Sequence, residues 1–290
     1  MKYVLVTGAF GGMGKSVTNA LVRRGFGVFA LDKRITEAGE NVIPIECDVT
    51  DEESVKNAAF YRDNVFSCVI PIECDVTDEE SVKNAAAVVG GITDELYAVL
   101  HFAGVYMLDS LAEMETADFE RIMRINFFGA FLVNKAFIPY LKSGGRIIMT
   151  TSELATLDPL PFTGIYAVSK AALDKYAYSL DMEVQLLGIK VSVLRAGAVN
   201  TGMLGASTDA LEKFCEKTKL YQCNAARFRH IVDSVEANSV SPDKIAEKVT
   251  CILERKNPAF AYSINRNPLL CLLNILPKRM QLFAIRCVLR

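Results

Sequence analysis

The sequence predicts a single α/β domain, a doubly wound parallel sheet with a helical C-terminal extension. Short apolar runs that end in glycine or polar residues alternate with segments of helical period. Of the 290 residues, 51% are hydrophobic and 23% are charged, which suffices for one large core. No linker-like stretch divides the sequence, so residues 1–290 are expected to form one domain. In such a fold, ligands bind at the carboxyl ends of the strands.

Strands and helices are expected to alternate regularly up to residue 197. Buried strands are predicted at residues 3–8, 27–32, 42–48 or its repeat 69–75, 98–104, 145–152 and 189–197. Helices between them are predicted at residues 15–24, 119–141 and 166–187. From Thr201 to Val240 the alternation stops, and this part is expected to be helical. A further helix should begin at Pro242, because Ser241 is a favoured N-cap residue and proline is favoured at the first helical position.

Composition and charge argue against several classes of function. The net charge is −2 and the pI about 5.9, without a dense basic segment, so no nucleic-acid partner is expected. The eight cysteines form no C-x-x-C pair, and the two histidines lie far apart, so neither a disulfide framework nor a metal site is predicted. A strand begins almost directly after Met1. No targeting peptide is therefore expected, and the predicted location is the cytoplasm.

The C-terminal stretch NPLLCLLNILPKRMQLFAIRCVLR is strongly apolar but is interrupted by Asn274, Pro277 and several basic residues. It lacks the ~20 unbroken apolar residues that a membrane-spanning helix needs. Two interpretations remain open. The segment could pack on its own domain or on a partner subunit, which is the favoured interpretation, or it could lie as an amphipathic helix on a membrane surface.

The stretch VLVTGAFGGMG places Gly8, Gly12 and Gly14 directly after the first strand and at the start of a helix. Glycines there let the backbone approach a pyrophosphate, and the helix N-terminus supplies N–H donors and a partial positive charge. Asp32 ends the second strand, where a carboxylate can accept hydrogen bonds from both hydroxyls of an adenosine ribose and would repel a 2′-phosphate. NAD is therefore predicted over NADP, although two basic residues that follow Asp32 weaken this preference.

The stretch YAVSK places Tyr166 and Lys170 on one face of a helix, because they are four residues apart. An ammonium beside a phenol favours the phenolate and lowers the pKa of the phenol. Ser152 ends the strand GRIIMTTS, and its hydroxyl could hold a reacting oxygen. Together with the dinucleotide loop, these residues predict an oxidoreductase acting on an alcohol or carbonyl group. The alternative is a non-catalytic dinucleotide-binding regulator on the same fold.

The chain resembles the short-chain dehydrogenase/reductase family over nearly its whole length. The resemblance rests on five motifs that occur in the family's order: TGAFGGMG, DVTD, HFAG, INFFG and AGAVNT. The first is similar to the family's TGxxxGxG loop, and HFAG stands where the family has NNAG. Asn126 in INFFG matches the family's helix asparagine. Ser152, Tyr166 and Lys170 match its catalytic serine, tyrosine and lysine. The resemblance implies a Rossmann-like fold.

The resemblance also implies a mechanism. Tyr166 would be the general acid/base, and Lys170 would bind the nicotinamide ribose and lower the pKa of the tyrosine. Ser152 would orient the substrate oxygen, and Asn126 would hold a water for proton relay, while hydride passes at C4 of the nicotinamide. The implied cofactor contacts are Gly8, Phe10, Gly12, Met13, Gly14, Asp32, Asp75, Val76, Ala103, Gly104, Tyr166, Lys170, Val199 and Thr201.

The chain departs from the family pattern in three places. His101 and Phe102 replace the two asparagines of NNAG, and Ala196 replaces a proline before the nicotinamide loop. Ser152 lies fourteen residues before Tyr166, one more than is usual in the family, and the proline-rich loop between them could absorb the extra residue. None of these changes removes a reacting group.

The stretch VIPIECDVTDEESVKNAA occurs twice, at residues 42–59 and 69–86. In this fold it corresponds to the third strand and the start of the next helix, with Thr50 or Thr77 as the expected N-cap and a glutamate three residues later. An exact repeat of this length indicates an in-frame duplication of one strand–helix unit.

The spacing of the two copies indicates which of them forms the third strand. The crossover to the next strand needs about two dozen residues after the strand-end aspartate. Asp75 precedes His101 by 26 residues, whereas Asp48 precedes it by 53. The second copy is therefore favoured for the third strand. The first copy would either add an edge strand or form a surface excursion.

The last part of the chain, residues 202–290, is expected to cover the substrate. Residues that could line the pocket are Leu154, Leu160, Phe162, Met203, Leu204, Leu211 and Phe214. The extension resembles the retinol and steroid dehydrogenase-like branch of the family, which implies a small lipophilic alcohol or ketone as substrate. The family resemblance also implies a homodimer or homotetramer built on the long helices around Asn126 and Tyr166.

Overall fold

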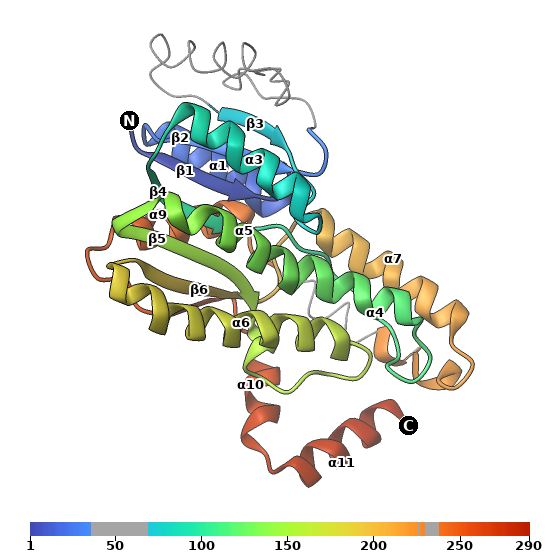
Figure 1. Ribbon diagram of the computed structural model, residues 1–290. Helices are drawn as coiled ribbons and strands as arrows, with labels where there is room; N and C mark the ends of the chain where they lie inside the picture. Colours follow the sequence, from blue (N-terminus) through green and yellow to red (C-terminus); the bar gives the residue numbers. More distant parts are fainter. Residues whose placement is uncertain (36–68, 226, 230–237) are drawn as a thin grey trace.

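The computed structural model describes residues 1–35, 69–225, 227–229 and 238–290. They form one α/β domain around a seven-stranded parallel sheet with strand order β3-β2-β1-β4-β5-β6-β7 (Figure 1). The strands are β1 (Tyr3–Thr7), β2 (Gly27–Asp32), β3 (Val69–Glu73), β4 (Leu96–His101), β5 (Leu141–Ser152), β6 (Lys190–Ala196) and β7 (Ala261–Ile264). The strand order reverses between β1 and β4. The crevice for a ligand lies at the carboxyl ends of strands on either side of such a switch point.

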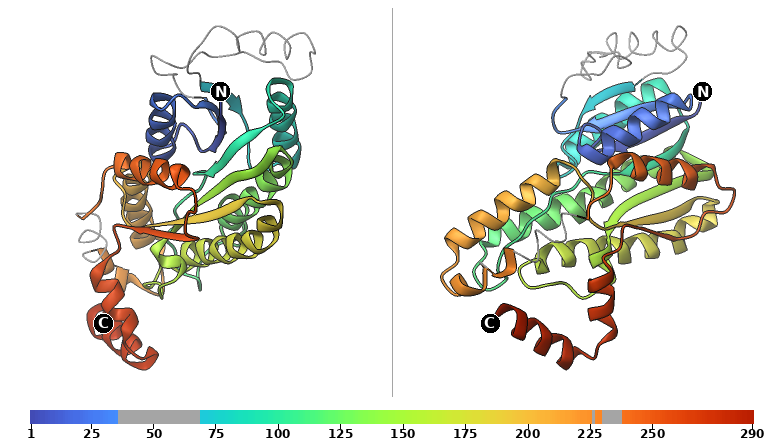
Figure 2. Two further views of the ribbon diagram at one scale, coloured as in Figure 1. Left: turned by 90° about the vertical axis from the view of Figure 1, so that its left-hand side faces the viewer. Right: turned by 180° about the vertical axis from the view of Figure 1, so that it is seen from behind.

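Helices cover both faces of the sheet, as the alternating sequence pattern predicts (Figure 2). They are α1 (Gly12–Arg23), α3 (Glu79–Ile92), α4 (Thr116–Met123), α5 (Gly129–Phe137), α6 (Gly164–Val184), α7 (Gly202–Lys217), α9 (Pro242–Glu254), α10 (Pro268–Ile275) and α11 (Lys278–Leu289). Buried residues of α3, α5 and α6 form one core with the sheet, and those of α1 and α9 form a second core on the opposite face. The helix expected at Pro242 is confirmed, with the Ser241 hydroxyl accepting from the Asp243 N–H.

The second copy of the repeat forms β3, as the spacing to His101 predicts. Val69–Glu73 pairs in parallel with β2 at the edge of the sheet. The first copy, residues 42–59 with Asp48, lies outside the described residues. The predicted N-cap of the following helix was wrong. Asp78 caps α3 by accepting from the N–H groups of Glu80 and Ser81, because the Thr77 hydroxyl and N–H are both donated to Asp75.

The helix expected at residues 119–141 is divided. A π-helical turn, Arg124–Phe128, separates α4 from α5, and a 3₁₀ turn, Ile138–Tyr140, ends the segment. Pro139 lies in that last turn and cannot donate a helical hydrogen bond, so the chain leaves the helix there and enters β5. π-Turns inside helices are frequent at functional sites, and this one contains Asn126.

The C-terminal part leaves the sheet after the edge strand β7. Helices α10 and α11 extend from the body of the domain in all views (Figures 1 and 2). None of the helices in the described ranges is long and apolar enough to cross a membrane.

Candidate active site

The glycine loop between β1 and α1 packs too closely on its neighbours for side chains. Gly8 has a φ of +64°, and a Cβ there would lie 2.6 Å from the backbone nitrogen of Ala103. A Cβ on Gly12 would lie 2.5 Å from the Cβ of Thr201. The N-cap of α1 is Gly11, which has no side chain to cover the first turn. The N–H groups of this helix start are thus accessible to a pyrophosphate, and the loop fits a dinucleotide.

An open cleft of about 1460 Å³ runs along the carboxyl ends of the strands. Ten of the predicted cofactor residues line it: Gly8, Gly12, Met13, Gly14, Asp32, Asp75, Val76, Ala103, Gly104 and Thr201. The other four, Phe10, Tyr166, Lys170 and Val199, do not. Phe10 packs into the core beside α1 and α9 and donates its N–H to Asp32, and Val199 is buried and forms a bridge with Val240.

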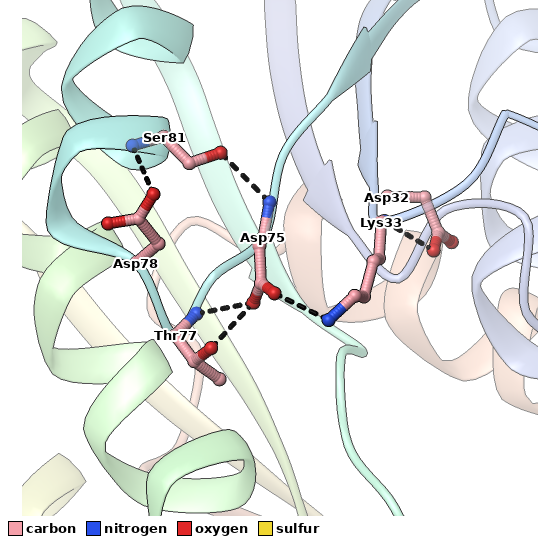
Figure 3. A network of polar contacts seen from close by, with 6 residues as sticks. All are labelled: Asp32, Lys33, Asp75, Thr77, Asp78 and Ser81. Carbon is pink, nitrogen blue, oxygen red and sulfur yellow. Dashed lines mark hydrogen bonds and ion pairs between the residues drawn. The ribbon is translucent and has the colours of Figure 1, made fainter.

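A polar network joins the ends of β2 and β3 at one end of this cleft (Figure 3). The Asp32 carboxylate accepts from the N–H of Phe10 at 2.9 Å and from that of Lys33 at 2.8 Å. The Lys33 ammonium lies 2.6 Å from Asp75 Oδ2, and Thr77 donates two hydrogen bonds to Asp75 Oδ1. Although partial burial acts in the opposite direction, these bonds from Lys33 and Thr77 hold the pKa of Asp75 at about 2. Sequence reasoning missed the Lys33–Asp75 pair.

The three predicted catalytic side chains meet where β5 and α6 lie side by side. Ser152 is the last residue of β5, and Tyr166 and Lys170 are one turn apart on α6. The Lys170 ammonium is buried, donates to the Thr150 carbonyl at 3.1 Å and lies 5.9 Å from the centre of the Tyr166 ring. Burial lowers the pKa of Lys170 to about 8.

The Tyr166 phenol does not have the lowered pKa that the sequence suggested. Burial and the neighbouring Tyr106, whose ring centre is 4.9 Å away, raise the pKa of Tyr166 above its ordinary value, while a hydrogen bond with Ser152 acts in the opposite direction. In this structure burial outweighs any influence of Lys170, whose ammonium is bonded to Thr150. Tyr166 is therefore a neutral phenol here, a proton donor.

Asn126 fixes the loop after β4 against α6. Its side-chain amide accepts from the Val105 N–H at 2.8 Å and donates to the Val105 carbonyl at 2.9 Å and to the Ser169 hydroxyl at 3.0 Å. A Cβ on Gly104 would lie 3.2 Å from Asn126 Oδ1 and 3.4 Å from Lys170 Nζ. The loop thus passes directly over both side chains. That Asn126 also holds a relay water stays a prediction.

The two departures in HFAG are accommodated inside the domain. Phe102 is buried in the core with α1 and α9. His101 Nε2 lies 2.9 Å from Asn134 Oδ1, and the Asn134 amide donates to the Tyr176 hydroxyl at 3.3 Å. Burial lowers the pKa of His101 to about 4, so the ring is neutral. Asn134 on α5 and Tyr176 on α6 were not foreseen as its partners from the sequence.

Glu153 is a second residue that sequence reasoning missed. It follows Ser152 directly and is buried, and burial raises its pKa. Its carboxylate accepts from the N–H of Asn267, the N-cap of α10, at 2.7 Å. A Cβ on Gly197, in the nicotinamide loop, would lie 3.3 Å from Glu153 Oε1. Glu153 therefore connects the catalytic strand end, the nicotinamide loop and the C-terminal helices.

The predicted substrate-pocket residues are mostly brought together. Phe162 has a φ of 68° and packs on the rings of Phe214, Tyr221 and Phe228 at centre distances of 4.5, 5.2 and 5.3 Å. Leu160 and Leu211 belong to the same apolar cluster, and Leu154 is half-buried beside Ser152. The side chains of Met203 and Leu204 lie outside the described residues.

The chain matches a family model described as short chain dehydrogenase over residues 2–63 and 61–212, and each range contains one copy of the repeat. Estradiol 17-beta-dehydrogenase 2 of Mus musculus is 34% identical over 226 residues, covering 73% of this chain and 52% of the mouse protein. The chain thus spans about half the length of that relative. A 3-ketodihydrosphingosine reductase of Bacteroides thetaiotaomicron is 26% identical over 289 residues, covering 98% of this chain and 96% of that protein. Among solved structures, a short chain dehydrogenase from Burkholderia cenocepacia in complex with NADP has a TM-score of 0.65 and 22% identity, covering 91% of this chain and 96% of that chain.

Proposed function

The chain belongs to the short-chain dehydrogenase family, and from this premise we propose that it is a nicotinamide-dependent oxidoreductase that interconverts a lipophilic secondary alcohol and its ketone. The observation that carries the proposal is the position of Tyr166. Its phenol is hydrogen-bonded with Ser152 at the end of β5, one helical turn from Lys170. The dinucleotide loop and its cleft lie at the carboxyl ends of the same sheet.

Tyr166 transfers the proton in this proposal. As a neutral phenol it can donate to the oxygen of a ketone while hydride reaches the carbon, and Ser152 holds that oxygen in place. A bound nicotinamide dinucleotide supplies or accepts the hydride. Lys170 holds the nicotinamide ribose. In the alcohol-oxidising direction the phenolate of Tyr166 accepts the proton, and a positive charge beside the phenol favours that form.

NAD is the proposed cofactor. The carboxylate of Asp32 lines the cleft where the adenosine ribose is expected, and it would repel a 2′-phosphate. Lys33, which follows Asp32 and also lines the cleft, is already paired with Asp75. The NADP complex of the Burkholderia protein, which shares the fold at 22% identity, carries no weight for this choice. Parallel fluorescence titrations with NADH and NADPH test the preference.

A lipophilic substrate is supported by the apolar cluster around Phe162 and by the named substrates of two relatives. One relative is named for estradiol, and the other, which aligns with nearly the whole chain, for 3-ketodihydrosphingosine. Both names denote largely apolar molecules with one reacting alcohol or ketone. A panel of hydroxysteroids, retinoids and long-chain 3-keto bases should therefore contain substrates, and short polar alcohols should not.

The decisive experiment is Tyr166→Phe. The variant should lose turnover by about 10³-fold or more, because the proton donor is removed, and should still bind NADH. A non-catalytic regulator is the competing function, and for it the wild type would bind NADH without turning over any member of the panel. Substantial activity in Tyr166→Phe would exclude the role proposed for the phenol.

A homodimer or homotetramer is proposed as the assembly. Large apolar side chains are exposed on the adjacent helices of one face, Phe119, Phe128 and Phe131 on the α4–α5 segment and Tyr178 and Met182 on α6. Burying such side chains between subunits would remove them from water. Light scattering coupled to gel filtration tests the mass, and Phe131→Asp should lower it.

A further inference from the structure

We propose that helices α10 and α11 form an arm that docks on the surface of an anionic lipid bilayer. The arm comprises Pro268–Ile275 and Lys278–Leu289 and projects from the domain at the end that holds the predicted substrate pocket (Figures 1 and 2). The proposal does not require the oxidoreductase activity. It would, however, explain how a lipophilic substrate reaches the enzyme.

The outward surface of the arm is rich in large apolar side chains. In α10 these are Leu269, Leu272 and Ile275, which are 72%, 61% and 78% exposed and follow one another at three-residue intervals on one helix face. In α11 the exposed apolar side chains are Met280, Leu282, Phe283 and Val288. Nothing in the described residues covers them. A surface of this kind marks an interaction site.

All the charged side chains after Glu254, a stretch that includes the arm, are basic. Seven of the chain's 32 Lys and Arg residues, and none of its 34 Asp and Glu residues, come after Glu254. Arg279 and Arg286 on α11 and Arg290 directly after it are exposed, and no carboxylate of the described residues pairs with them. An anionic surface complements this charge, and each Lys or Arg near such a surface strengthens binding.

The arm is held to the domain by specific contacts at its base and its tip. Asn267 donates to Glu153, the Asp158 N–H donates to Asn274 at 2.5 Å, and Lys278 forms an ion pair with Asp158. At the tip, Leu289 is buried in the apolar cluster around Phe162, and its carbonyl accepts from Asn224. These contacts occupy the inner face only, so the arm can present its outer face while the site stays folded.

A bilayer fits this surface better than a second copy of the chain does. In a two-fold contact between copies of the chain the arm would face itself, and its basic residues would meet like charges, since no Asp or Glu follows Glu254. In α11, Arg279 and Arg286 alternate with exposed apolar residues such as Phe283. Arginine stems can lie along acyl chains while their guanidinium groups reach phosphates, which is the arrangement of interfacial helices.

Co-sedimentation of the full-length protein with vesicles tests the proposal. Binding is expected to vesicles of phosphatidylcholine with phosphatidylserine, and about tenfold less to phosphatidylcholine alone or at high salt. The variants Leu272→Ser/Phe283→Ser and Arg279→Glu/Arg286→Glu should each reduce binding about tenfold. The matched controls Leu186→Ser/Leu187→Ser and Arg23→Glu/Lys142→Glu change exposed residues elsewhere and should bind as the wild type does.

Two outcomes would overturn the proposal. One is that the wild type does not sediment with the vesicles, or that both arm variants sediment with them as much as the wild type does. The other is a lower mass of the arm variants in gel filtration, which would assign the arm to a contact between copies of the chain. NADH titration of every variant shows that the domain is folded. It also separates failure of this proposal from failure of the proposed function, because vesicle binding needs no turnover.

Discussion

The titratable groups at the ends of β2 and β3 are exposed and paired with one another, whereas those beside the ends of β4 and β5 are buried and meet neutral partners. Lys33 and Asp75 form the exposed pair. On the buried side, Lys170 donates to a backbone carbonyl and His101 meets the amide of Asn134. The pKa of Asp75 is lowered by pairing, and those of Lys170 and His101 are lowered by burial. Substitutions at the exposed end should therefore alter selectivity, and those at the buried end should alter protonation, catalysis and stability.

After Tyr166→Phe, the largest effect is expected for Lys170→Ala. The substitution removes the buried ammonium beside the reacting phenol and the group proposed to hold the nicotinamide ribose. We expect kcat/KM to fall by about 10³-fold, the size of effect seen when one preorganised electrostatic group is removed. Steady-state kinetics on the ketone found in the substrate screen provides the measurement, with Lys175→Ala on the outer face of α6 as the matched control.

The pH dependence of kcat/KM separates the effect of the Lys170 charge from the effect of its side-chain volume. Because burial lowers its pKa to about 8, the ammonium is present below that pH and is lost above it. The kcat/KM for NADH, which reports the free enzyme, should therefore decrease above about pH 8. Lys170→Arg keeps its charge and should be slower but without this decrease. A wild-type profile that stays flat well above pH 8 would contradict the assignment.

His101 should make the fold sensitive to acid. Its pKa is lowered by burial from 6.5 in the unfolded chain to about 4 in the folded chain, so the unfolded chain binds more protons between these values. The free energy of unfolding is thus highest above pH 6.5 and falls by about 3 kcal/mol as the pH approaches 4. Urea unfolding of the wild type and His101→Gln across this range measures it. Equal losses in both proteins would show that His101 is not the cause.

Asp32→Asn should change cofactor selectivity and little else. Removing the carboxylate charge near the expected 2′-phosphate should raise the affinity for NADPH relative to NADH about tenfold, since two charges about 4 Å apart near a protein surface interact by a few kcal/mol at most. The amide can still accept from the Phe10 N–H. Parallel titrations provide the test, with Asp94→Asn, an exposed residue outside this cleft, as the control. An unchanged ratio of the two affinities would place the cofactor's ribose elsewhere.

Much of the site could be predicted because its residues are linked to local sequence patterns. A glycine loop between a strand and a helix, a strand-terminal serine and an i, i+4 pair each define their own geometry. The assignment of the second repeat copy to β3 followed from chain length alone, since a crossover needs a minimum number of residues. These inferences required no knowledge of distant contacts.

The missed features depend on contacts between distant segments or on competition between neighbours. The environment of Glu153 is defined by Asn267, 114 residues later, and that of His101, the last residue of β4, by Asn134 on α5. Thr77 and Asp78 are both good cap residues, and only the position of Asp75 decides between them. The raised pKa of Tyr166 results from burial, which helical spacing to a lysine does not reveal.

Lys33→Ala is expected to have the smallest effect. It tests whether a short distance between charges or their burial decides how much they contribute to stability. Lys33 and Asp75 lie 2.6 Å apart, closer than any contact of Lys170, yet the lysine side chain is 73% exposed. Exposed pairs contribute about 1 kcal/mol or less, because water screens the attraction and ordering two side chains costs entropy. Lys33→Ala should therefore lower the free energy of unfolding by less than the acid titration of His101 does, although it removes an ion pair and the titration removes none. Urea unfolding of the wild type and Lys33→Ala at neutral pH measures this change in the free energy of unfolding. If Lys33→Ala cost as much as protonating His101, the short distance and not burial would govern stability in this cleft.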